Sequence, residues 1–177
     1  VNLSAALWHE LARLRSEELL DDEGGLEALD EGLKRFPEHP TLIELREELG
    51  RHAKGWKELS ERYEREARDA SNPALRATLY ARAGSLVWQY KKKGKDKEAE
   101  RLFQSAITAD PTDGRAARLL VDILLQRSRP GEAADLLMKH AEAARSRDES
   151  LHAFRRAGRI FLRELQEEER AATCFRR

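Results

Sequence analysis

The chain has 177 residues, of which 37% are charged and 40% apolar. Glu, Lys, Arg, Leu and Ala dominate, so the composition favours helices and leaves little material for strands. No apolar run approaches the roughly 18 residues that a membrane-spanning helix needs. The segment 119–125 comes nearest, and Asp122 interrupts it. We therefore expect a soluble, helix-rich protein.

The net charge of the whole chain is zero, but its two parts carry opposite net charges. Residues 1–50 hold 13 acidic and 5 basic side chains, a net charge of −8, and residues 51–177 hold 20 acidic and 28 basic ones, a net charge of +8. Two ends of opposite charge could steer a partner, or copies of the chain, into a head-to-tail arrangement. A drift in the composition of solvated helix faces explains the same numbers, and the sequence leaves both explanations open.

A single cysteine, Cys174, excludes an internal disulfide and favours a reducing compartment. We therefore expect a cytoplasmic protein. The chain begins at Val1 without a Met and stops at Arg177 inside an expected helix. We read it as a piece of a longer protein, which leaves targeting by an upstream segment open.

Apolar residues recur at helical spacing from one end of the chain to the other. They predict ten helices, over residues 3–18, 24–36, 40–52, 55–69, 73–91, 96–109, 113–127, 130–146, 149–165 and 167–177. In the first helix the buried stripe is expected at Trp8, Leu11 and Ala12. The second helix contains Gly25 and Gly32, each of which costs roughly 1 kcal/mol relative to Ala in a helix.

The second pair of helices has an uncertain register. One pattern places Ile43 in the core, followed by Trp56, Leu59 and Tyr63 on the next helix. Another pattern, shifted by one residue, places Leu42, Leu45 and Leu49 there. Both stay open from the sequence.

The third pair is the clearest. Its first helix has a stripe at Tyr80, Ala83, Gly84 and Val87, and its second has one at Ala99, Phe103 and Ala106. Asp110-Pro111 ends the second helix, because proline lacks the amide donor and disfavours helical geometry in the residue before it.

The same pattern returns later in the chain. The fourth pair has Ala117, Leu120, Val121 and Leu124, then Ala133 and Leu137; the fifth has Phe154, Ala157, Gly158 and Phe161, then Ala171 and Phe175. Ala99 and Ala133 are 34 residues apart, and Ala171 follows 38 residues later. Such a period indicates stacked repeats, in which small residues let two helices cross closely.

These residues resemble the tetratricopeptide repeat family. The positions that carry the resemblance are Tyr80, Gly84, Ala99, Phe103, Ala106, Pro111, Ala133, Phe154, Gly158, Ala171 and Phe175. Segment 55–67 looks like the degenerate alternating subtype of long bacterial repeat proteins. The resemblance implies an all-α, right-handed superhelix of about five helix pairs. The resemblance also implies one repeat domain over 1–177, with repeats at 3–38, 39–72, 73–112, 113–148 and 149–177.

In this family the first helix of each pair lines a concave groove in which partners bind. The side chains expected on that side lie next to the core stripe on each of these helices. We call them the inner-face positions: Ala6, His9, Arg13, Ser16, Thr41, Glu44, Glu48, Arg51, Thr78, Ala81, Ser85, Trp88, Arg115, Arg118, Asp122, Leu125, His152, Arg155, Arg159 and Leu162. The family's carboxylate clamp of Lys and Asn is not reproduced, which disfavours recognition of a chaperone tail by that route.

The later inner-face positions are rich in arginine, whose guanidinium pairs bidentately with carboxylates. We therefore expect a non-catalytic scaffold that binds another protein or an acidic peptide. The expected partner-binding residues are Trp88, Arg115, Arg118, Leu125, His152, Arg155 and Arg159. Two alternatives remain: Trp88 packs against the next helix, or the arginines are solvated or paired with Glu.

The sequence offers no catalytic, cofactor or metal site, and we expect no enzyme activity. The five histidines lack metal-ligand spacing to one another or to Cys174, which we expect to pack in a helix. Gly24-Gly25 precedes no phosphate-binding lysine, so a P-loop is excluded.

Nucleic acid is the rival partner. Lys91, Lys92, Lys93, Lys95 and Lys97 concentrate five positive charges in one turn, where they could contact phosphates. No aromatic platform flanks this turn, and the net charge is zero, so protein binding is favoured.

Overall fold

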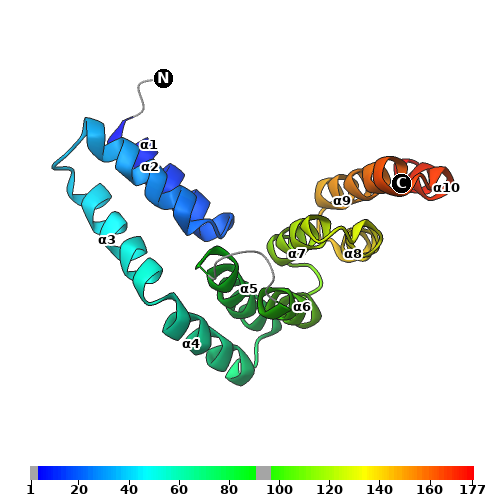
Figure 1. Ribbon diagram of the computed structural model, residues 1–177, viewed down its shortest axis with the longest axis horizontal. Coiled ribbons are helices and arrows are strands. Elements are labelled where there is room, and N and C mark those ends of the chain that lie inside the picture. The colour runs from blue at the N-terminus through cyan, green and yellow to red at the C-terminus, as the bar shows by residue number, and fades with distance from the viewer. Residues whose placement is uncertain (1–3, 91–96) are drawn as a thin grey trace. The chain divides into compact units, whose positions relative to one another are not determined.

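The computed structural model describes residues 4–90 and 97–177, and in this part of the chain it contains ten α-helices and no strand (Figure 1). The helices are α1 (Ala5–Arg13), α2 (Asp22–Arg35), α3 (Pro40–Lys54), α4 (Trp56–Asp69), α5 (Pro73–Tyr90), α6 (Lys97–Ala109), α7 (Gly114–Gln126), α8 (Pro130–Ala143), α9 (Arg147–Ile160) and α10 (Glu168–Phe175). Two π-helical turns, η1 (Leu14–Glu18) and η2 (Phe161–Leu165), extend α1 and α9. The all-α class is confirmed, and the helix ends agree with the expected ones to within three residues.

Polar caps and prolines determine where the helices begin. The Asp21 carboxylate accepts the Gly24 amide at 2.9 Å, and the Asp113 carboxylate accepts the Ala116 amide at 3.1 Å. The Ser146 hydroxyl accepts the Glu149 amide at 3.1 Å in the same way. Proline is the first residue of α3, α5 and α8, where its missing amide costs nothing.

The chain divides into two compact units. The first comprises residues 1–65 and 82–99, and the second comprises residues 66–81 and 100–177. Each is described separately below.

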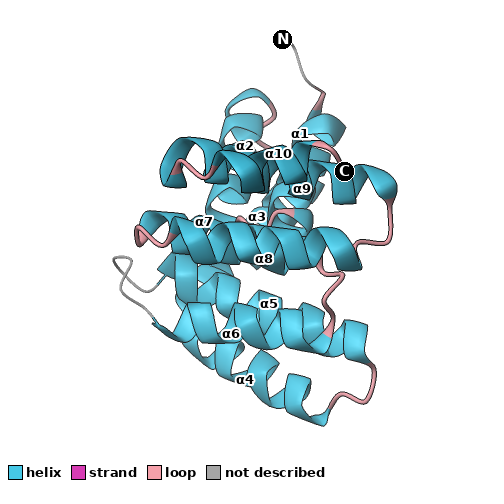
Figure 2. Ribbon diagram, turned by 90° about the vertical axis from the view of Figure 1, so that its right-hand side faces the viewer, coloured by secondary structure: helices cyan, strands magenta, loops and turns pink. Residues whose placement is uncertain are grey.

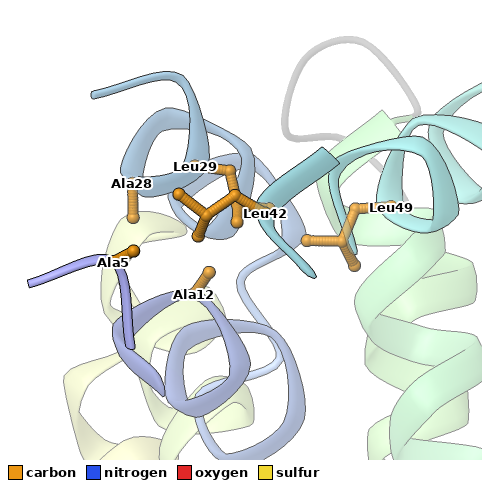
Figure 3. Packing of buried hydrophobic residues seen from close by; sticks show 6 residues of the cluster. All are labelled: Ala5, Ala12, Ala28, Leu29, Leu42 and Leu49. Atoms are coloured by element: carbon orange, nitrogen blue, oxygen red, sulfur yellow. The ribbon is translucent and has the colours of Figure 1, made fainter. Parts of the chain in front are cut away.

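The core of the first unit lies where α1, α2 and α3 meet (Figure 3). It is built from Ala5, Ala12, Ala28, Leu29, Leu42 and Leu49. Since Leu42 and Leu49 are buried while Ile43 is 37% exposed, the expectation of Ile43 in the core is wrong. The side of α3 that faces α1 and α2 is the one that carries positions 42, 45 and 49.

Glycine allows α1 and α2 to approach each other closely. A Cβ atom on Gly25 would lie 3.2 Å from the Ala12 carbonyl oxygen, and one on Gly32 would lie 2.9 Å from the Trp8 Cβ. Both neighbours are fixed by backbone, so neither can move aside. The two glycines that weaken α2 as an isolated helix are therefore the residues that let it pack.

The second unit stacks its helices in pairs. Figure 2 shows α9–α10 lying against α7–α8, with α6 on the other side of that pair. The expected stripes of these helices are buried, including Phe103, Ala106, Ala117, Leu120, Val121, Leu124, Ala133, Leu137, Phe154, Ala157, Gly158, Phe161 and Ala171. Of the other repeat positions, Gly84 and Ala99 are buried, Tyr80 is partly buried, and Pro111 is exposed just after α6.

Phe175 departs from the expected core position. Its ring lies over Gly158, where an added Cβ would come within 2.7 Å of the ring, yet the residue is 50% exposed. One face of the ring therefore packs on α9, and the rest remains accessible to solvent.

The close packing at Gly32 predicts the effect of an alanine substitution, and Gly50 serves as the control. Gly32→Ala should lower the free energy of unfolding, because overpacking costs about 1–3 kcal/mol. That outweighs the roughly 0.5–1 kcal/mol gained by removing a helical glycine. Gly50, on α3, has no atom within 4 Å of a built Cβ, so Gly50→Ala should raise stability. Urea unfolding measures both, and a Gly32→Ala protein as stable as Gly50→Ala would contradict the packing described here.

Candidate binding surface

The expected partner-binding residues are divided between the units. Arg115, Arg118 and Leu125 lie on α7, and His152, Arg155 and Arg159 lie on α9, all in the second unit. Trp88 lies in the part of α5 that belongs to the first unit and is partly buried. The three basic side chains of α9 are exposed, and those of α7 are partly exposed.

An ion pair ties the first helices of the last two pairs together. The Arg156 guanidinium donates to the Asp122 carboxylate, joining α9 to α7. Asp122 is the one acidic inner-face position of these two helices, and the pair neutralises it. Arg156 is not one of the inner-face positions, because the spacing that selects Arg155 and Arg159 places it off the predicted face. Arg155 and Arg159, the two inner-face arginines of α9, are exposed.

On α5 the expected inner face is partly closed. Ser85 is buried, and its hydroxyl donates to the Leu20 carbonyl at 2.5 Å; the Gln89 side-chain amide donates to the same oxygen. Leu20 follows η1 in the left-handed region, with φ at 55°, which turns its carbonyl toward α5. Ala81 is also buried, so the expectation of an exposed inner face is wrong for both Ala81 and Ser85.

The first unit contains a hollow of about 580 Å³. Side chains from α1, η1, α3, α4 and α5 line it: His9, Arg13, Ser16, Glu17, Thr41, Glu44, Leu45, Glu48, Leu49, His52, Arg62, Tyr63 and Arg82. Six of the eight inner-face positions on the first two pairs are among these residues; Ala6 and Arg51 are not. We call this the first-unit hollow. Its volume is in the range that holds a ligand or several side chains of a partner.

The sequence did not predict the part that α4 and α5 play in this hollow. Arg62 and Tyr63 come from α4, the second helix of its pair, and Arg82 comes from α5. No periodicity marks these residues as neighbours of Glu44 or Glu48, because their proximity depends on how α3, α4 and α5 pack.

A buried carboxylate lies next to Ser16, one of the residues that line the hollow. Asp22 is 8% exposed and accepts a hydrogen bond from the Ser16 hydroxyl at 2.5 Å. The Nδ1 atom of His52 lies 3.9 Å from its other oxygen, beyond hydrogen-bond range. The serine hydroxyl meets the carboxylate directly, so these three side chains do not have the serine–histidine contact of a catalytic triad. This arrangement supports structure, with Asp21 and Asp22 at the N-terminus of α2.

A second hollow, of about 500 Å³, lies between α6, α7 and α8 in the second unit. Its floor is apolar, but its rim charges pair within the chain. The Arg129 guanidinium meets Glu100 at 2.7 Å and Glu132 at 2.6 Å, and it lowers the pKa of Glu132. Asp135 meets Arg170 at 2.5 Å. Several charges at this rim are therefore satisfied within the chain.

The lysine-rich turn falls largely outside the described residues. Lys91, Lys92, Lys93 and Lys95 are not among them, and Lys97 is the first residue of α6.

Metal sites, a reactive cysteine and membrane-spanning helices are the other features to consider in the part of the chain that the structure describes. No three His, Cys, Asp or Glu side chains there come together as a metal site would require. Cys174 is buried, which raises the pKa of its thiol. No described helix is both long and apolar enough to cross a membrane. Comparison with known protein families and with curated proteins found no match.

Tyr90 lies near the acidic start of α2. Its hydroxyl is buried and has no hydrogen-bond partner among the described residues. Burial, with smaller effects from the Asp22, Glu23 and Asp21 charges, raises the pKa of Tyr90 to about 12. Both effects disfavour the phenolate, because it would be a desolvated anion beside other anions.

This shift predicts a pH dependence of stability. In the unfolded chain Tyr90 ionises near its ordinary pKa of 10.0, whereas in the folded chain it keeps its proton to about pH 12. The unfolded state therefore gains free energy by ionising first, and stability should fall as pH rises through this range. Tyr90→Phe should remove that part of the fall, measured by urea unfolding at several alkaline pH values. An unchanged pH profile would show that Tyr90 ionises normally in the folded protein.

Proposed function

We propose that the chain is a non-catalytic helical-repeat scaffold of the tetratricopeptide type, a right-handed superhelix, that binds a segment of a partner protein along the first helices of its pairs. The first-unit hollow is the observation that supports this most, because six residues selected by repeat position alone line it. A surface hollow formed by chance would not be expected to be lined by residues at corresponding positions of successive helix pairs.

The second unit favours an acidic segment. The Asp122–Arg156 pair neutralises the one acidic inner-face position of α7 and α9, and Arg155 and Arg159 are exposed on α9. Arginine forks match carboxylates geometrically and are frequent hot spots of interfaces. Cytoplasmic location and head-to-tail self-association, expected from the single cysteine and from the charge asymmetry, remain parts of the proposal.

Charge reversal on this face tests the function. Arg118→Glu with Arg155→Glu should weaken binding of a fluorescein-labelled peptide of alternating Glu and Ser by about tenfold or more, because attraction becomes repulsion. The melting temperature should stay close to that of the parent. Arg147→Glu with Arg163→Glu is the matched control, since both residues are exposed on α9 and η2 but off the inner face.

Two results would count against the proposal. If Arg118→Glu with Arg155→Glu and its matched control bind the acidic peptide with equal affinity, the inner face of α7 and α9 does not bind this peptide. Tight binding of single-stranded RNA that falls steeply with salt, and is lost when Lys91, Lys92, Lys93, Lys95 and Lys97 become Ser, would favour the nucleic-acid alternative.

A further inference from the structure

The hollow of about 500 Å³ in the second unit, which we call the second-unit hollow, has α6 and α8 as its two walls. At one end the Arg129 guanidinium of α8 lies 2.7 Å from a Glu100 carboxylate oxygen of α6. At the other end the His140 Nδ1 atom donates to the Pro111 carbonyl at 3.1 Å, just after α6. Glu100 and Pro111 are 11 residues apart, as are Arg129 and His140, so these contacts are separated by roughly 16 Å along the helices. The walls are therefore joined at both ends, and the hollow exists without a ligand.

The surface between these two contacts is apolar. Leu120 and Leu124, one turn apart on α7, form its floor, and Ile107 and Leu136 line it from α6 and α8. Ile107 and Leu136 are only partly buried, so part of each side chain stays in contact with water. Apolar side chains of a partner would bind here favourably, because they would remove this surface from water.

The carboxylates of the lining are already paired with arginines. The Arg129 guanidinium lies 2.6 Å from Glu132 in addition to its contact with Glu100. The Arg170 guanidinium lies 2.5 Å from Asp135. A lysine or arginine of a partner would have to displace one of these arginines, so the hollow does not favour a basic ligand.

Lys139 differs from the other charged residues of the lining. It is exposed and makes no ion pair with a described residue. It follows Leu136 by three residues on α8, so the two side chains are neighbours on one side of the helix. The adjacent His140 has both ring nitrogens engaged, since its Nε2 atom lies 3.2 Å from a Glu149 carboxylate oxygen. One positive charge is therefore left beside the apolar surface, at the His140 end.

We propose that the second-unit hollow binds an amphipathic segment of a partner protein, whose apolar side chains cover Ile107, Leu136 and the α7 floor and whose acidic side chain pairs with Lys139. Charge complementarity selects this occupant, because the lining offers an apolar surface and one available cation. The exposed Gln104 and Lys139 side chains border the hollow, which is open to solvent and about three helical turns long. Such a trough suits a chain segment better than an enclosed small molecule. This surface lies between the second helices of two pairs, and so goes beyond the inner face named in the proposed function.

Three fluorescein-labelled peptides of equal length test the inference, all in a Gly-Ser background. The first carries two Leu and a Glu, the second the same two Leu and a Lys, and the third two Ser and the Glu. In fluorescence anisotropy the Leu–Glu peptide should bind the parent chain about tenfold more tightly than either of the others. The reason is that this peptide alone matches both the apolar surface and Lys139.

Charge reversal at Lys139 should exchange the preference between the two leucine peptides. Lys139→Glu should weaken binding of the Leu–Glu peptide about tenfold and tighten binding of the Leu–Lys peptide by a similar factor. Lys57→Glu changes the net charge equally at an exposed position of α4 outside the lining, so it is the matched control and should leave both affinities unchanged.

A substitution on the apolar wall tests the other half of the inference. Leu136→Gln should weaken binding of both leucine peptides, because it removes apolar contact area from the hollow. Its melting temperature shows whether the variant is folded. If it is not, Lys139→Glu still decides the outcome, since that position is exposed.

Four results would overturn the inference. If Lys57→Glu weakens the Leu–Glu peptide as much as Lys139→Glu does, the effect is one of net charge. If Arg118→Glu with Arg155→Glu abolishes binding of this peptide, the peptide binds the inner face of α7 and α9, and the proposed function stands while the present inference fails. If all three peptides bind the parent equally, the hollow does not select this class of partner. A chain that dimerises in sedimentation velocity, and that Leu136→Gln makes monomeric, would assign the hollow to a second copy instead.

Discussion

The structure depends on how closely two helices of a pair can approach. At Gly25 and Gly32 the α2 backbone comes so near to α1 that a single added carbon would contact the Ala12 carbonyl or the Trp8 Cβ. Gly158 has the same role on α9, where it receives the Phe175 ring. Because the buried residues at these crossings are small, large apolar side chains such as Leu29 and Leu42 can fill the space beside them.

The position of the candidate site follows from this packing. A helix that uses one side for its partner within the pair, and another for the neighbouring pair, leaves a third side for ligands. In the first unit that side borders the hollow. Where a turn folds over it, as Leu20 does over Ser85, the side is buried and unavailable. The proposed binding surface is therefore the side of these helices that no described element covers.

The sequence was sufficient for the helices because their signals are local. Prolines at the starts of α3, α5 and α8, and stripes such as Phe154, Ala157 and Phe161, depend on spacing along one segment. Prediction from the sequence failed where the burial of a residue depends on segments far away in the chain. Ile43 and Leu42 fit a helical stripe equally well, and only contact with α1 and α2 selects Leu42. Burial of Ser85 depends on a left-handed residue 65 positions away, and the lining of the first-unit hollow depends on how α1, α3, α4 and α5 pack.

The most direct test of the account is to see where a peptide touches the protein. An amide NMR titration of the chain with the peptide of alternating Glu and Ser should shift resonances of inner-face positions on α7 and α9, such as Arg118 and Arg155, and leave the exposed side of α2 unchanged. Shifts confined to α2, α6, α8 or α10 would contradict it, because the second helices of the pairs, and not the first, would then carry the binding surface.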